Sequence, residues 1–177
     1  DFLLTAAMNP CNCGYYPDHN KCHCSAASIQ RYIGKISQPL LDRIDICVEA
    51  PQLTYEELME KRTNESSADI RRRVVTCHEL KTERFKDYGF IHKSQIPSNL
   101  IDTFCHLDDE GRQFMEEMYS TYDLTARTYH KVLRVARTIA DMDGKENIKL
   151  NHLEEAILYK SLDKNTGSTK NDRIKKI

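Results

Sequence analysis

The sequence Asn9-Pro-Cys-Asn-Cys-Gly-Tyr-Tyr-Pro-Asp-His-Asn-Lys-Cys-His-Cys24 organises the first part of this chain. It contains two Cys-x-Cys pairs separated by eight residues: Cys11, Cys13, Cys22 and Cys24. Gly14 and Pro17 lie between the pairs and favour a turn that brings the four sulfur atoms together. Zinc takes four thiolates in tetrahedral geometry, and a loop without a core of its own gains folding free energy from the metal. The spacing therefore predicts one structural zinc ion.

Two other states of these cysteines remain open, because Cys-x-Cys is less diagnostic than Cys-x-x-Cys. They are two disulfides, or reduced thiols in a metal-free loop. His19 and His23 could each replace a thiolate, but as polar loop residues we expect them to face water. The remaining cysteines are odd in number and lie in apolar or helical stretches, which favours a reducing cytoplasm over a disulfide framework: Cys47, Cys77 and Cys105.

Length and charge limit the function classes. The 177 residues can form one good core or two small lobes. The net charge of -1 gives no general attraction to nucleic acid, so DNA binding would need local basic patches. No run approaches the roughly 18 apolar residues of a membrane span. The chain starts at Asp1 inside an apolar run and without a secretory signal, so we expect a fragment of a longer protein and no membrane partner.

The first fifty residues read as an incomplete α/β unit. Phe2–Met8 is a short apolar run that suits a buried parallel strand, and Ile44–Ala50 reads as a second strand closed by Pro51. Ser25–Ile36 is weakly helical between them, and Pro39 starts a short helix or turn. The strands that these two would pair with are not in this sequence. We expect residues 1–51 to be a truncated α/β piece.

From Thr54 onward the pattern is helical. Three capping side chains mark helix starts at Thr54, Ser66 and Asn151. Apolar periodicity predicts helices over about 66–85, 108–119, 125–142 and 151–162. The Ser66 helix should bury one face, which consists of Ile70, Val74, Cys77 and Leu80. The fold class is therefore mainly α, with a helical bundle over 54–162 and a disordered tail over 163–177.

Three features carry possible chemistry. Asn9 stands at the predicted C-terminal tip of a buried strand, where doubly wound sheets place ligands, although it could only cap a turn. Arg43 stands between a turn and a strand, where it could stabilise phosphate charge or simply pair with Asp42 or Asp45. A basic stripe opposite the apolar face of the predicted 125–142 helix is more often a solvated face than a site: Arg127, Lys131 and Arg134.

Four motifs that follow one another along the chain are similar to those of a known protein family. They are Ala7-Met-Asn-Pro-Cys-x-Cys-Gly14, Cys22-x-Cys-Ser25, Leu40-Leu-Asp-Arg-Ile-Asp45, and a long motif from Thr125 to Asp141. Together they resemble the C-terminal part of the magnesium-chelatase-like AAA+ ATPases of the ComM/YifB type. The similarity covers nearly the whole chain up to its tail.

The resemblance implies roles for three residues. Asn9 would be the sensor-1 residue that positions the attacking water, Arg43 the arginine finger acting in trans, and Arg127 the sensor-2 residue of a helical lid. It also implies ATP and magnesium in the full-length protein, a hexameric ring, and a link to DNA branch migration in recombination and natural transformation.

One departure from an ATPase is plain in the sequence. No stretch reads Gly-x-x-x-x-Gly-Lys-Ser/Thr, so a phosphate-cradling loop is missing and we expect no ATP hydrolysis by this chain alone. The leading hypothesis is the sensor and lid part of a DNA-associated AAA+ motor. A second is a non-enzymatic zinc-loop and helical module that binds protein or nucleic acid through a basic face. A third and weaker one is a metallochelatase accessory subunit.

Overall fold

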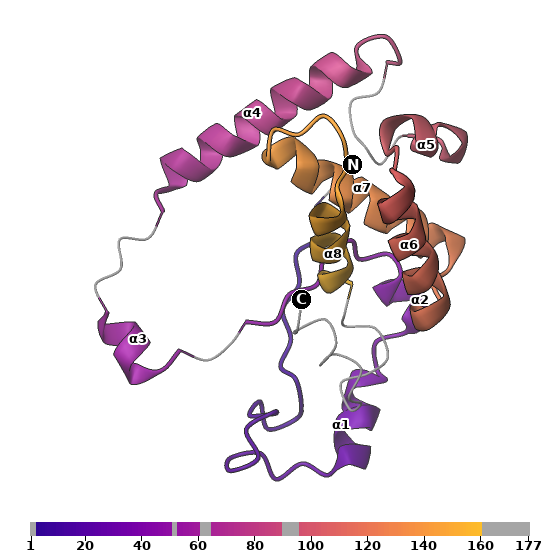
Figure 1. The fold of residues 1–177 in the computed structure, drawn as a ribbon. Helices are drawn as coiled ribbons and strands as arrows, with labels where there is room; N and C mark the ends of the chain where they lie inside the picture. The colour runs from indigo at the N-terminus through magenta and orange to yellow at the C-terminus, as the bar shows by residue number, and fades with distance from the viewer. Residues whose placement is uncertain (1–2, 51–52, 61–64, 90–95, 161–177) are drawn as a thin grey trace.

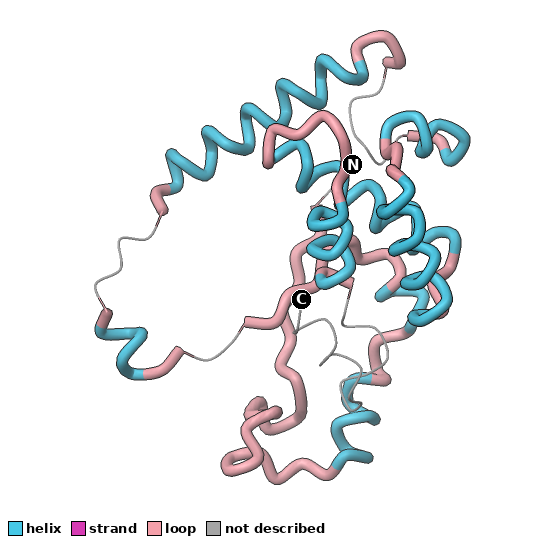
Figure 2. The backbone as a smooth tube through the Cα atoms, viewed as in Figure 1, coloured by secondary structure: helices cyan, strands magenta, loops and turns pink. Residues whose placement is uncertain are grey.

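The computed structural model describes residues 3–50, 53–60, 65–89 and 96–160. Figures 1 and 2 show that the regular secondary structure in these ranges is helical, which confirms the mainly α class. The helices in chain order are α1 Ala26–Ile33, α2 Gln38–Leu41, α3 Tyr55–Met59, α4 Ser67–Phe85, the 3-10 helix η2 Ser98–Leu100, α5 Ile101–Phe104, α6 Asp109–Tyr122, α7 Ala126–Met142 and α8 Leu150–Leu158. The predicted tail at 163–177 lies outside the described residues.

The two predicted strands are not formed within the described residues. Residues 3–8 and 44–50 run as irregular chain, and most of their apolar side chains are exposed. Leu3 is 92% exposed and Val48 68% exposed. A strand needs a neighbouring strand to pair its backbone N–H and C=O groups, and within the described ranges no strand lies beside either segment. Both strand predictions are therefore wrong, because an apolar run forms a strand only where another strand lies beside it.

The cap predicted at Ser66 is confirmed, and Thr125 caps a further helix. Ser66 precedes α4, and its side chain accepts a hydrogen bond from the Asp69 N–H at 3.2 Å. Thr125 precedes α7 in the same way, with the Thr128 N–H as donor at 3.2 Å. The start at Asn151 was wrong, because α8 begins at Leu150. Here the His152 ring reaches back and accepts a hydrogen bond from the Lys149 N–H at 3.0 Å.

The main core belongs entirely to the helical part of the chain. Helix α7 packs against α8, α4 and α5, while α6 packs against α8 (Figure 1). The buried apolar side chains of this core all lie between Phe85 and Ile157. The largest of those that are fully buried are Phe85, Ile101, Met115, Leu133, Ile148 and Leu153. The buried apolar side chains of this packed body therefore all come from the chain after α3.

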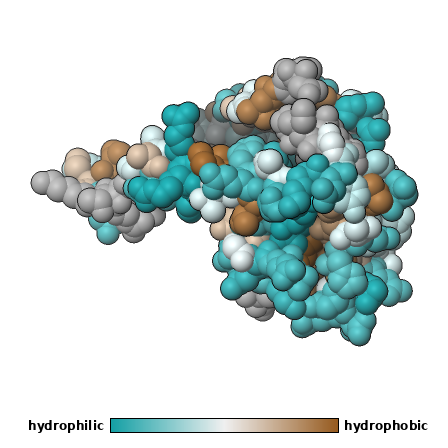
Figure 3. Space-filling model, turned by 90° about the horizontal axis from the view of Figure 1, so that it is seen from above, coloured by the Kyte–Doolittle hydropathy of each residue, from teal (hydrophilic) through white to brown (hydrophobic). Residues whose placement is uncertain are grey.

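Helix α4 does not bury the face predicted for it. Ile70, Val74 and Leu80 are between 41% and 45% exposed, and Phe85 at the end of the helix is its buried residue. Figure 1 shows α4 running away from the helical body toward α3. Figure 3 shows hydrophobic groups on this projecting part. Side chains of α4 are buried only where its C-terminal end contacts the helical body. The amphipathic pattern therefore indicates the apolar face of α4 but not what packs against it.

Candidate metal centre and exposed arginines

The four cysteines of the N-terminal loop converge on one point. The Sγ atom of Cys11 lies 3.3 Å from that of Cys13 and 3.8 Å from that of Cys22, and Cys13 and Cys22 are 3.5 Å apart. With Cys24, all four sulfur atoms lie within 4.8 Å of one another. A disulfide would need about 2.05 Å. The cysteines are free, so the alternative of two disulfides, which the sequence left open, is not what the structure shows.

A turn at Gly14 brings the two pairs together, as the sequence predicted. The Gly14 N–H donates to the Cys11 carbonyl at 3.1 Å, and Gly14 has a φ of +83°, which favours glycine. A second turn brings in the other pair, where the Cys22 N–H donates to the Asp18 carbonyl at 2.7 Å. Turns of the local backbone therefore bring the four sulfur atoms together.

Helix α1 packs against the cysteine cluster. Ile29 is buried against Cys11 and Cys22, with Tyr16 and Ile33 packed around them. Ser25 follows the last cysteine directly and caps α1 by accepting a hydrogen bond from the Ser28 N–H at 3.2 Å. A metal held by the cysteines would therefore fix the loop to the start of this helix.

The pKa values of two thiols in the cluster are shifted in opposite directions. Burial raises the pKa of Cys11, but hydrogen bonds from the Tyr16 N–H and from Cys13 and Cys22 outweigh it and bring that pKa to about 6. The Cys24 N–H lowers the pKa of Cys22, but burial and the charge on Cys11 raise it to about 12. Like charges this close oppose each other, and a divalent cation reverses that effect for every thiolate it binds.

The donor set fits a closed tetrahedral thiolate site. Four sulfurs at about 2.3 Å from one metal ion would lie about 3.8 Å from each other, close to the separations found here. His19 and His23 are exposed and are not part of the cluster, as predicted. The four cysteines would fill every position, so such an ion would support the fold and would not activate water.

Asn9 is exposed at the entrance to this loop. Its side chain lies beside the Gly14 turn, where a Cβ atom added to Gly14 would approach the Asn9 amide nitrogen to 3.5 Å. It does not stand at a strand tip, because the strand before it is not formed. In the structure, the Asn9 side chain therefore lies against the turn of the cysteine loop.

Arg43 is exposed, and the two acids beside it are engaged elsewhere. Its guanidinium donates to the Pro39 carbonyl at 2.6 Å. Asp45 lies 2.7 Å from Lys131 on α7, and Asp42 lies 4.0 Å from Lys160 after α8. Among the described ion pairs, neither acid is matched with Arg43.

The predicted basic stripe on α7 is reduced to one exposed arginine. Lys131 pairs with Asp45, and Arg134 donates to the Ile96 carbonyl at 3.0 Å. Arg127 is exposed in the first turn of the helix. Of the three basic residues, Arg127 is the one best placed to meet a ligand.

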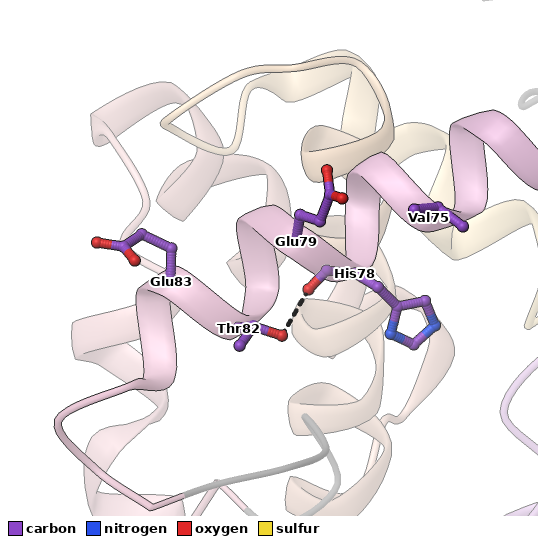
Figure 4. A pocket seen from close by; sticks show the side chains of 5 residues that line it. All are labelled: Val75, His78, Glu79, Thr82 and Glu83. Atoms are coloured by element: carbon purple, nitrogen blue, oxygen red, sulfur yellow. Dashed lines mark hydrogen bonds between the residues drawn. The ribbon is translucent and has the colours of Figure 1, made fainter.

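The hollows on the described surface are separate from these residues. One follows helix α4 and is lined by Val75, His78, Glu79, Thr82 and Glu83 (Figure 4). All five come from one helix, so this is a shallow depression and lacks the walls of a cofactor site. A second, smaller hollow lies nearby, between Cys77 and Thr138. Neither is lined by Asn9, Arg43 or Arg127.

Comparison with known proteins gives two consecutive family matches. The model described as magnesium chelatase, subunit ChlI, matches residues 1–58, and that for the ChlI C-terminal part matches residues 64–160. The second covers more than half of the chain. The chain belongs to the magnesium chelatase ChlI family. It is a magnesium-chelatase-like protein of the ComM/YifB type, which confirms the resemblance of its motifs, and thus part of an AAA+-type protein.

Two relatives show how much of the family protein is present. The competence protein ComM of Haemophilus influenzae is 37% identical over 163 residues, which are 91% of this chain and 31% of the relative. YifB of Escherichia coli is 35% identical over 166 residues, 92% of this chain and 31% of the relative. The chain therefore spans about a third of the length of the curated relatives it matches. None of the helices within the described ranges has the length and apolarity needed to cross a bilayer.

Proposed function

We propose that this chain is the sensor and lid part of an AAA+ ATPase that acts as a DNA-associated motor. In the full-length protein, residues 1–51 end the ATPase core and residues 54–162 form the lid. The rest of that protein holds ATP and Mg²⁺, and six copies form a ring in the cytoplasm. The name of the competence protein ComM supports a role linked to competence.

Each candidate residue has one task in this proposal. Asn9 positions the attacking water, and Arg127 reaches from the lid toward the nucleotide bound by its own subunit. Arg43 stabilises the charge that develops on the nucleotide of the neighbouring subunit. Zinc bound by the four cysteines holds the loop after Asn9 in place and takes no part in hydrolysis.

The observation that carries this proposal is the environment of Arg43. An arginine finger must keep its charge available for a phosphate on another subunit. The acids that could neutralise Arg43 within its own motif lie against Lys131 and Lys160 instead, and the guanidinium is exposed. A structural pair with Asp42 or Asp45, the competing interpretation of the sequence, is not what the described contacts favour.

The same contacts weaken the non-enzymatic alternative. A nucleic-acid module would need one continuous basic face made by α4 and α7. Lys131 and Arg134 are engaged inside the chain. On α4, Arg72 lies 3.1 Å from Asp69 and Arg73 lies 2.6 Å from Glu65. No described feature favours the accessory role in a metallochelatase.

A mixing experiment with the full-length protein tests the trans role of Arg43. Arg43→Ala should bind ATP normally but lose about 10³ to 10⁵ in hydrolysis rate, the usual effect of an arginine finger. Mixing it with subunits disabled in the phosphate-binding loop should restore some activity, at interfaces where an intact loop meets an intact Arg43. Arg112→Ala, which removes another exposed arginine, is the matched control and should stay active. Full activity of the Arg43→Ala ring would refute the assignment.

The DNA role is tested separately by the rate of ATP hydrolysis of the full-length protein. Single-stranded, double-stranded and branched DNA are added in turn, at more than one salt concentration. A DNA motor should hydrolyse ATP faster with its substrate, and the effect should weaken with salt because phosphate contacts release counterions. A rate that no DNA changes would argue against a DNA-associated motor.

A further inference from the structure

Two ion pairs flank Arg43 and fasten its segment to the helical body. Asp45 lies 2.7 Å from the Lys131 ammonium, and Asp42 lies 4.0 Å from that of Lys160. Lys131 is in the middle of α7, and Lys160 follows the end of α8. Two attachment points on different elements fix the orientation of a segment as well as its position. The residue between the two acids is therefore carried by the helical body.

A backbone hydrogen bond adds a third attachment. The Cys47 N–H donates to the carbonyl of Tyr159, the residue that caps the C-terminal end of α8, at 2.8 Å. The last carbonyls of a helix have no partner within it, so this bond satisfies one of them. The segment from Asp42 to Cys47 thus completes the end of α8.

In these ion pairs the side chains of the two lysines are less exposed than that of Asp45. Lys131 keeps 15% of its side-chain exposure and Lys160 keeps 11%, whereas Asp45 keeps 68%. A cation whose stem is covered by protein has lost much of its hydration and needs an anion nearby. The helical body therefore presents two lysines with largely covered side chains, and the acids of the Arg43 motif lie against them.

We propose that Lys131 and Lys160 are positioning residues for Arg43. They hold Arg43 through Asp45 and Asp42, so that a movement of the helical body moves Arg43 with it. This inference rests on the proposed function, in which Arg127 of that body meets the nucleotide of its own subunit and Arg43 meets that of the neighbour. A change at one nucleotide is thereby passed to the next site around the ring.

A charge swap in the full-length protein tests this coupling. Lys131→Glu places two anions together and should release the segment. Misplaced catalytic groups cost up to about 100-fold, so kcat for ATP should fall about 10-fold or more. KM should stay within about two-fold, because an interaction made only in the transition state is lost. The double variant Asp45→Lys with Lys131→Glu should recover most of kcat. Lys149→Glu breaks the exposed 3.2 Å pair with Asp108 and serves as control.

The background of Arg43→Ala separates positioning from general structural damage. If Lys131 acts through Arg43, Lys131→Glu should lower kcat no further once Arg43 is gone. Equal losses in both backgrounds would overturn the positioning role, and so would an unchanged kcat of Lys131→Glu in a ring that needs Arg43.

Amide exchange of the peptide containing Cys47 gives a readout that does not depend on ATP. Lys131→Glu should speed exchange there, and the double swap should slow it again. If Arg43→Ala keeps full activity, the proposed function fails, and with it the transfer of a signal to the neighbour. Faster exchange in Lys131→Glu would still support the attachment itself, whereas unchanged exchange would overturn it.

Discussion

Asp141 and Arg137 lie one turn apart on α7 and form an ion pair that is buried on both sides. The Arg137 Nε donates to Asp141 Oδ1 at 3.0 Å, and the side chains are 3% and 0% exposed. Arg84 at the end of α4 reaches the same oxygen at 2.6 Å. Arg137 also donates to the carbonyls of Lys145 and Glu146. This pair therefore joins α4, α7 and the loop before α8.

Removing the anion from this pair should strongly destabilise the helical body. Asp141→Ala leaves Arg137 charged and buried, and breaking a buried pair in this way costs about 3–5 kcal/mol. The midpoint of urea unfolding measures the loss. Asp109→Ala breaks an exposed pair with Arg112 on α6 and should leave the midpoint close to that of the parent. Equal midpoints for Asp141→Ala and the parent would contradict the role given to this pair.

The cysteine cluster should bind one zinc ion. Protein purified under reducing conditions should contain about one equivalent, and a chelator should loosen the loop together with α1, because the metal holds both. Cys22→Ser should lower the metal content, whereas Cys47→Ser, outside the cluster, should not. Metal analysis and amide exchange provide the measurements. A metal-free protein whose loop is equally protected would exclude a structural role for the metal.

The cap of α6 should make stability depend on acid pH. The Gly111 N–H and the Lys149 ammonium lower the pKa of Asp108 from its ordinary value of 3.8. The stabilisation from the charged cap is therefore fully present above pH 3.8 and is lost as the pH falls through the lower folded pKa. Asp108→Ala should be less stable than the parent at neutral pH, and the difference should shrink as the pH falls below the ordinary Asp pKa of 3.8 and through the lower folded pKa. Urea unfolding across this range tests it, and a difference that grows with acidity would be evidence against it.

The helical part should fold without the first fifty residues. Its buried apolar core lies between Phe85 and Ile157, so a fragment of residues 54–162 keeps all of it. The fragment loses Asp45 and Asp42, the partners of Lys131 and Lys160, but removing that segment also returns both lysines to water, so the loss should be small compared with the core. Amide exchange should show protection through α7 and α8. Rapid exchange throughout α7 would mean that the first fifty residues are needed for folding.

Local features of the sequence determined the parts of the structure that depend on neighbours along the chain. Ser66, Asp108 and Thr125 cap their helices because a cap needs only the N–H groups of the next turn. The sulfur cluster also formed as predicted, since turns within the same loop bring the two Cys-x-Cys pairs together. Both the helical class and the metal-site candidate could therefore be predicted before any tertiary contact was known.

Tertiary contacts decided the features in which one segment needs another far along the chain. The spacing of Arg137 and Asp141 was visible as i, i+4 within an apolar stretch, but their burial came from Arg84 and the packing around α7. The same holds for Lys131. Its place in the basic stripe predicted a solvent-exposed side chain, but in the structure it pairs with Asp45. The apolar segments at 3–8 and 44–50 lack neighbours for a sheet and stay irregular. Periodicity tells which face of a segment is apolar or charged, whereas its partner is set by the free energy of long-range packing.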